Sequence, residues 1–116
     1  MPDSVIIHGI RNCDTMKKAR AWLEARGIAH AFHDYKTAGL ERGMLERWVK
    51  EVGWERLLNR AGTSFRKLPD AEKADLDESK AVALMLANPS LVKRPVLSAK
   101  GQLAVGFSPD QYERIF

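Results

Sequence analysis

Residues 4–35 decide the fold, and they read SVIIHGIRNCDTMKKARAWLEARGIAHAFHDY. The run Ser4–His8 is apolar and β-branched and ends at Gly9, which indicates a buried strand followed by a turn. Apolar residues then recur at helical spacing, at Met16, Ala19 and Leu23. The alternation in Ala31–Tyr35 predicts a second strand. Because a short helix joins the two strands, we expect them to be parallel and adjacent.

Residues 38–88 carry only helical patterns. An apolar stripe with a period of 3.6 residues predicts a first helix, with the positions Leu40, Met44, Leu45, Trp48, Val49 and Val52. Gly62–Ser64 is expected to be a loop. Another helix is expected at Asp77–Ala87, with three residues facing inward, Val82, Met85 and Leu86. The middle of the chain is therefore predicted to be a helical insertion at about 38–88.

Strand patterns return near the end of the chain. Pro95–Ser98 and Leu103–Gly106 flank a short turn and predict a β-hairpin. A helix start with a capping box follows, formed by Ser108, Pro109 and Gln111. The order of elements predicts an α/β fold, a β-α-β/β-β-α mixed sheet with a helical insertion, in one domain spanning residues 1–116.

Length, charge and cysteine content limit the classes of protein. The chain has 116 residues, a formal net charge of +4 and one cysteine, Cys13. An intramolecular disulfide and a zinc site built on paired cysteines are therefore excluded. No apolar run is long enough for a transmembrane helix, and the first ten residues lack the pattern of a secretory signal. We expect a cytoplasmic protein with a reduced thiol.

Cys13 is the main candidate for chemistry. It lies just after a strand and a glycine turn, at or next to the first residue of a helix, where free N–H groups and the helix dipole stabilise a thiolate. A lone cysteine is more often a small buried hydrophobe. The polar neighbours Asn12, Asp14 and Thr15 favour a reactive thiol. Since no second cysteine is present, disulfide chemistry needs an outside thiol, most simply glutathione.

The bond between Arg94 and Pro95 precedes a predicted strand and is a candidate for the cis form, which would expose backbone to an extended peptide or to glutathione. An ordinary trans proline at a strand start is the commoner alternative. Arg60 and Arg66 flank the glycine loop and suit a carboxylate or an oxyanion. Arginines with this spacing are also often solvated surface groups.

The histidines do not form a metal-ligand pattern. His30 and His33, if both lie on a strand, point to opposite faces, and His8 is distant in sequence. Phosphate loops and nucleotide-binding fingerprints are absent, because Gly9 and Gly27 stand alone. No metal or nucleotide cofactor is expected.

Several motifs together resemble the ArsC/Spx family. They read VIIHGIRNCDT at 5–15, FHDYK at 32–36, LLNR at 57–60, GTSFRKL at 62–68, KRP at 93–95 and GFS at 106–108. The resemblance covers nearly the whole chain and keeps the order of the motifs. It implies a thioredoxin-like fold with a helical insertion, in which Pro95 is the cis-proline beside the cysteine.

The resemblance also implies roles for individual residues. Cys13 matches the catalytic cysteine of the arsenate reductases, which attacks arsenate and is resolved by glutathione and glutaredoxin. Arg94 matches one arginine of the oxyanion site of that family, and Arg60 matches a second with an offset of one residue. The third arginine of the family site aligns near Gly106, where this chain has no arginine. The histidine that precedes the cysteine in the family aligns with Gly9. Loss of one of three arginines weakens anion binding, so arsenate is disfavoured as the natural substrate.

The Spx regulators form another branch of this family. Their redox switch is usually a C-x-x-C motif, whereas Cys13 is followed here by Asp14, Thr15 and Met16. A disulfide sensor of that type is excluded, while contact with RNA polymerase through other surfaces stays open.

The chain resembles most the YffB-like branch of Gram-negative bacteria, which is inferred to contain glutathione-dependent thiol reductases. We therefore expect a glutathione-dependent thiol–disulfide reductase with Cys13 as the catalytic residue. The expected binding residues for the substrate or glutathione are Asn12, Arg60, Arg66, Arg94 and Pro95. Glutathione is the expected co-substrate and glutaredoxin a further candidate partner; a metal, a membrane or a nucleic acid is not expected. The alternatives are a redox-inactive adaptor or regulator of the Spx type, and a weak arsenate reductase.

Overall fold

The computed structural model describes residues 5–11 and 13–116. The chain divides into two compact units, which we name the sheet unit and the helical unit. The sheet unit comprises the chain up to Gly39 together with Arg94–Phe116, and the helical unit comprises Leu40–Lys93. Among the described residues, no helix combines the length and apolar character needed to cross a membrane.

The described part of the sheet unit contains one four-stranded sheet in the order β2-β1-β3-β4. Its strands are β1 (Ile6–Gly9), β2 (Ala31–Asp34), β3 (Val96–Ala99) and β4 (Gln102–Val105). Strand β1 pairs in parallel with β2 and antiparallel with β3, which pairs antiparallel with β4. This arrangement confirms the predicted mixed sheet and the thioredoxin-like fold.

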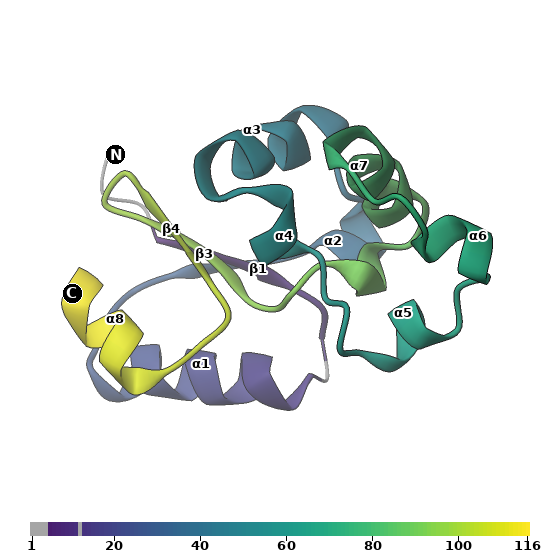
Figure 1. Cartoon of the computed structure of the whole chain (residues 1–116). Coiled ribbons are helices and arrows are strands. Elements are labelled where there is room, and N and C mark those ends of the chain that lie inside the picture. The colour runs from purple at the N-terminus through teal and green to yellow at the C-terminus, as the bar shows by residue number, and fades with distance from the viewer. Residues whose placement is uncertain (1–4, 12) are drawn as a thin grey trace. The chain divides into compact units, whose positions relative to one another are not determined.

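The described residues of the sheet unit form three helices, α1 (Asp14–Ala25), α2 (Tyr35–Ala38) and α8 (Pro109–Ile115). Figure 1 shows α1 and α8 on the same face of the sheet. The core on this face contains apolar residues of both helices and the sheet, namely Ile7, Met16, Ala19, Leu23, Leu97, Ala104 and Tyr112. The predicted helical spacing of Met16, Ala19 and Leu23 thus correctly identified the buried face of α1.

Side-chain hydrogen bonds and backbone angles at the turns determine where several strands and helices begin and end. The second strand ends at Asp34 and not at Tyr35, because the Asp34 carboxylate accepts hydrogen bonds from the N–H groups of Lys36 and Thr37 and starts α2. The predicted hairpin is confirmed. Its two central turn residues, Lys100 and Gly101, have φ of 51° and 73°, the sign that a type I′ turn requires.

The capping of α8 agrees in part with the prediction. The Ser108 hydroxyl accepts a hydrogen bond from the N–H of Gln111 at 3.1 Å, as a capping box requires. Among the described residues, the Gln111 side chain does not bond back to the Ser108 N–H; its Nε2 donates to the Val105 carbonyl at 3.4 Å. The side chain therefore ties α8 to the end of β4.

The described residues of the helical unit form five α-helices and one 3₁₀ helix. They are α3 (Arg42–Val52), α4 (Trp54–Leu57), α5 (Thr63–Arg66), α6 (Asp70–Lys73), α7 (Glu78–Ala87) and η1 (Pro89–Leu91). Burial of Leu45, Trp48 and Val49 confirms the centre of the predicted stripe, whereas Leu40 lies before α3. The expected Gly62–Ser64 loop is wrong in part, since Gly62 is the N-cap of the short helix α5. An isolated antiparallel bridge joins Leu58 to Val92, which helical periodicity does not reveal.

Candidate functional site

Cys13 is the N-cap residue of α1. Its backbone is extended, with φ −94° and ψ 130°, and its carbonyl accepts the N–H of Lys17 at 3.0 Å to start the helix. The thiol is partly buried and faces the first turn of α1. The position that usually carries a serine or aspartate oxygen therefore carries a sulfur. The first N–H groups of the helix are left to stabilise a negative charge on it.

The surroundings of the sulfur favour its ionised form. Burial is the largest single effect and raises the pKa of Cys13. Hydrogen bonds from the N–H groups of Met16 and Thr15 and from the Arg94 side chain lower it, and the positive charge of Arg94 lowers it further. Together these contacts outweigh burial, so the pKa of the Cys13 thiol lies below its ordinary value.

Arg94 comes from the entry to β3. The peptide bond between Arg94 and Pro95 is cis, as the family resemblance implied. Pro95 is buried, and its carbonyl accepts a hydrogen bond from the N–H of Gly106 at 2.8 Å. The structure thus brings two of the predicted site residues, Cys13 and Arg94, into direct contact within the sheet unit.

Tyr35 is a member of this cluster that the sequence analysis missed. Its side chain is fully buried, and burial raises the pKa of the phenol. Arg94 donates a hydrogen bond to the Tyr35 oxygen, and the charge of Cys13 also acts on it. A signal was present in the sequence, since Tyr35 is the last residue of the predicted second strand. The carboxyl end of a strand beside a catalytic loop is where site residues gather.

The remaining predicted residues lie elsewhere in the chain. Asn12 is outside the described residues. Arg60 and Arg66 are exposed and belong to the helical unit. The Arg60 guanidinium lies 5.8 Å from the centroid of the Trp54 ring, and Nη2 of Arg66 donates to the Ala61 carbonyl at 2.7 Å. Both arginines therefore have local contacts that orient them within that unit.

Comparison with known proteins now gives the family. The sequence model of the ArsC family matches residues 8–115 of this chain. The chain belongs to the ArsC family. The solved structure of the YffB (PA3664) protein is 56% identical, covers 97% of this chain and 98% of that one, and superposes with a TM-score of 0.93. An arsenate reductase (ArsC) related protein of Brucella melitensis is 60% identical, with 96% and 92% coverage and a TM-score of 0.79.

The global transcriptional regulator Spx of Streptococcus mutans is a more distant ArsC-family relative. It is 30% identical over 102 residues, which are 86% of this chain and 74% of that protein. The family expected from the sequence motifs is therefore confirmed, and the chain is similar both to a YffB protein and to an Spx regulator.

Beyond the cysteine, this ArsC-family chain has a pair of histidines that the sequence analysis did not anticipate. His8 and His33 are register partners on the parallel strands β1 and β2, and their Nδ1 atoms lie 3.0 Å apart. His8 is 7% exposed, and burial together with the nearby charge of His33 lowers the pKa of His8 to about 4. His8 is therefore neutral at pH 7. Among the described residues, no group of three or more potential ligands forms a metal site.

His30 lies outside the strand that carries His33, in agreement with the predicted start of that strand at Ala31. It precedes β2, and its Nδ1 lies 3.0 Å from the Ile28 carbonyl. The reason is that the chain reaches the sheet only at Ala31, whose N–H donates to the Val5 carbonyl at 2.9 Å.

Proposed function

We propose that this ArsC-family protein is a glutathione-dependent thiol–disulfide reductase with Cys13 as its single nucleophile. The observation that carries the proposal is the contact of the sulfur with Arg94 and with the first N–H groups of α1, which lowers the pKa of Cys13. Thiolates, not thiols, attack disulfides. A cysteine stabilised in this way therefore has a larger reactive fraction at neutral pH than a free thiol.

The reaction proceeds by successive thiol–disulfide exchanges. The Cys13 thiolate attacks one sulfur of a substrate disulfide, so that a mixed disulfide forms and the other substrate sulfur leaves as a thiolate that takes a proton from water. A glutathione thiolate then attacks the Cys13 sulfur and releases the second substrate thiol. A second glutathione attacks the glutathione sulfur, which regenerates the Cys13 thiolate. The substrate disulfide gains two electrons, and two glutathiones are oxidised to glutathione disulfide.

Arg94 has two roles in this proposal. It stabilises the Cys13 thiolate as the attacking group, and it stabilises the same thiolate again when it leaves in the last exchange. Asn12, Arg60, Arg66 and Pro95 are proposed to bind glutathione or the substrate, the arginines through carboxylates. We place the reaction in the cytoplasm, where glutathione keeps thiols reduced.

A regulator is the second candidate function, favoured by the 30% identity with the Spx regulator of Streptococcus mutans. Such a protein would act by contacting RNA polymerase and would have no need for an ionised cysteine. The two functions differ in what they require of Cys13, so its reactivity separates them.

The test is the reaction of the reduced protein with oxidised glutathione between pH 5 and 9, followed by intact mass. We expect one glutathione adduct per chain, with a midpoint below the ~8.5 of a free thiol, and release of the adduct on addition of reduced glutathione. The Cys13→Ser variant is the control and should form no adduct. Slow modification with the midpoint of a free thiol would reject the reductase and favour the regulator.

A further inference from the structure

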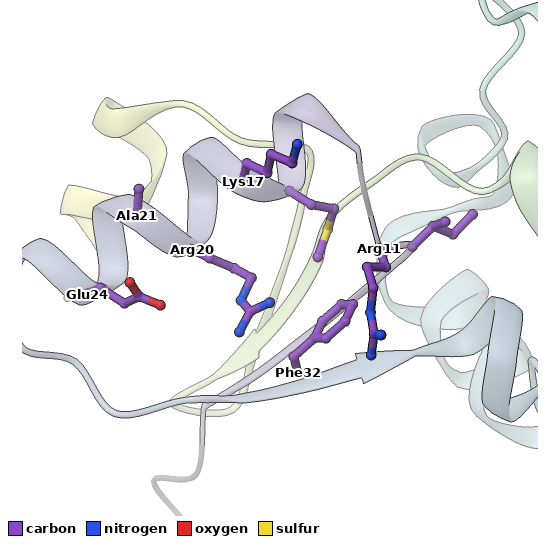
Figure 2. A pocket seen from close by; sticks show the side chains of 8 residues that line it. Arg11, Lys17, Arg20, Ala21, Glu24 and Phe32 are labelled. Atoms are coloured by element: carbon purple, nitrogen blue, oxygen red, sulfur yellow. The ribbon is translucent and has the colours of Figure 1, made fainter.

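A cavity of about 380 Å³ lies along α1 in the sheet unit, as Figure 2 shows. It extends from Arg11, before the helix, along one face of α1 to Glu24, and Phe32 of β2 forms part of its opposite wall. The helix residues on the wall, Lys17, Arg20 and Glu24, are spaced by three and four residues and therefore share one face. The volume lies within the range of pockets that hold small molecules.

Positive charge dominates the wall of this cavity. Arg11, Lys17 and Arg20 contribute three cations, and Glu24 contributes the one carboxylate. The ion pairs found among the described residues involve none of these four side chains. The wall of the cavity therefore carries a net positive charge, and no ion pair among the described residues neutralises it.

Arg20 is oriented by an aromatic contact. Its guanidinium carbon lies 4.8 Å from the centroid of the Phe32 ring, and its Nε is buried without a hydrogen-bond partner among the described residues. Figure 2 shows Arg20 extending from α1 to one side of Phe32, with Arg11 on the other side of the ring. An arginine held against a ring keeps the donors on its edge available for a flat anionic group.

The apolar part of the wall narrows the class of ligand. Met16 and Phe32 offer a polarisable sulfur and an aromatic ring, which suit a planar apolar body. Inorganic phosphate has no apolar body to cover Met16 and Phe32, so the cavity favours an organic acid over it. We propose that this cavity binds a small planar carboxylate, an aromatic or conjugated organic acid, with its carboxylate on Arg20 and its apolar body against Met16 and Phe32.

Binding of this acid does not depend on the reactivity of the Cys13 thiol. It can therefore be tested in a variant that lacks the thiol and has no reductase activity. The experiment is a titration of the full-length, ¹⁵N-labelled Cys13→Ser protein with benzoate at constant ionic strength, followed by amide chemical shifts. We expect saturable shifts confined to the lining of the cavity, namely Ile10, Arg11, α1 between Met16 and Glu24, and Phe32. The neutral isostere benzamide should bind at least about tenfold more weakly, because it cannot form a charge-assisted pair with an arginine.

Substitutions identify the side chain that binds the carboxylate of the ligand. Arg20→Met should weaken benzoate binding about tenfold, and Arg20→Lys should restore part of it, since lysine keeps the charge but not the planar fork. Lys18→Met is the matched control: it removes a neighbouring cation that does not line the cavity and should leave binding unchanged. Glu24→Gln should strengthen binding. Equal binding of benzoate and benzamide, equal effects of Arg20→Met and Lys18→Met, or equal shifts with inorganic phosphate would overturn the proposal.

Discussion

Arg94, the residue before Pro95, donates a hydrogen bond to the sulfur of Cys13. The same guanidinium also donates to the oxygen of Tyr35, which is fully buried. The three residues come from separate parts of the chain: the N-cap of α1, the start of α2 and the entry to β3. Because a buried phenol holds the arginine from one side, its charge acts on the sulfur from a fixed position. The arrangement is that of a positioned cation beside a nucleophile.

Removing the charge of Arg94 should slow the chemistry of Cys13. In Arg94→Met, the pKa of Cys13 should rise because a hydrogen bond to the thiolate and a positive charge are lost. The rate of adduct formation at pH 7 should fall about tenfold, the effect expected for loss of a hydrogen bond to a charged group. Thiolate absorbance against pH measures the shift directly. Arg94→Lys keeps the charge and should recover part of the rate; equal behaviour of the two variants would show that charge is not the cause.

Replacing Cys13 by serine should separate stability from activity. Cys13 occupies the N-cap of α1, where a sulfur is a weak hydrogen-bond acceptor and serine is a preferred residue. Cys13→Ser should therefore have a free energy of unfolding about 1 kcal/mol higher than Cys13→Ala, and both variants should abolish the adduct. Cys13→Ala is the matched control, since it also removes the nucleophile but cannot cap the helix. Denaturant unfolding of the three proteins gives the comparison, and a serine variant no more stable than the alanine variant would contradict the prediction.

Most of the fold was predictable because periodicity reports which face of an element is buried. The spacing of Met16, Ala19 and Leu23 identified α1, and the paired strand patterns around Gly101 identified the hairpin. The errors are local and have local causes. The second strand ends early because the Asp34 side chain caps a helix, and the bridge between Leu58 and Val92 joins residues too far apart in sequence to leave a pattern.

The candidate site was predictable only in part. Cys13 could be singled out because its polar neighbours and its place before a helix are visible in one short segment. Contact between Arg94 and Tyr35 depends on the pairing of β1 with both β2 and β3, which puts the end of β2 and the start of β3 at the same edge of the sheet. Sequence periodicity does not encode this pairing. The pair formed by His8 and His33 depends on strand register in the same way, since a shift of one residue would send the side chains to opposite faces.

The two buried tyrosines should respond differently to loss of their hydroxyl groups. Tyr112 Oη is buried without a hydrogen-bond partner among the described residues. The Tyr112 ring packs edge-to-face on the Phe107 ring, with 4.8 Å between the ring centroids. Tyr112→Phe keeps the ring contact and removes an unsatisfied group, so stability should be unchanged or slightly higher. Tyr35→Phe removes a hydrogen bond with Arg94 and should cost about 1 kcal/mol and slow adduct formation. Thermal unfolding and the adduct assay measure both, and equal destabilisation by the two variants would contradict this difference.

His8 should make the protein less stable as the pH falls. The pKa of His8 is about 4 in the folded protein, against 6.5 in the unfolded chain, so between these values the unfolded state binds the extra proton. The stabilisation is complete above pH 6.5 and is lost as the pH falls through 4, by roughly 3 kcal/mol in total. Urea unfolding at pH 7.5, 5.5 and 4 measures the loss. His8→Gln should remove most of this pH dependence and His30→Gln should leave it unchanged, whereas an unaltered pH profile in His8→Gln would assign the dependence to other groups.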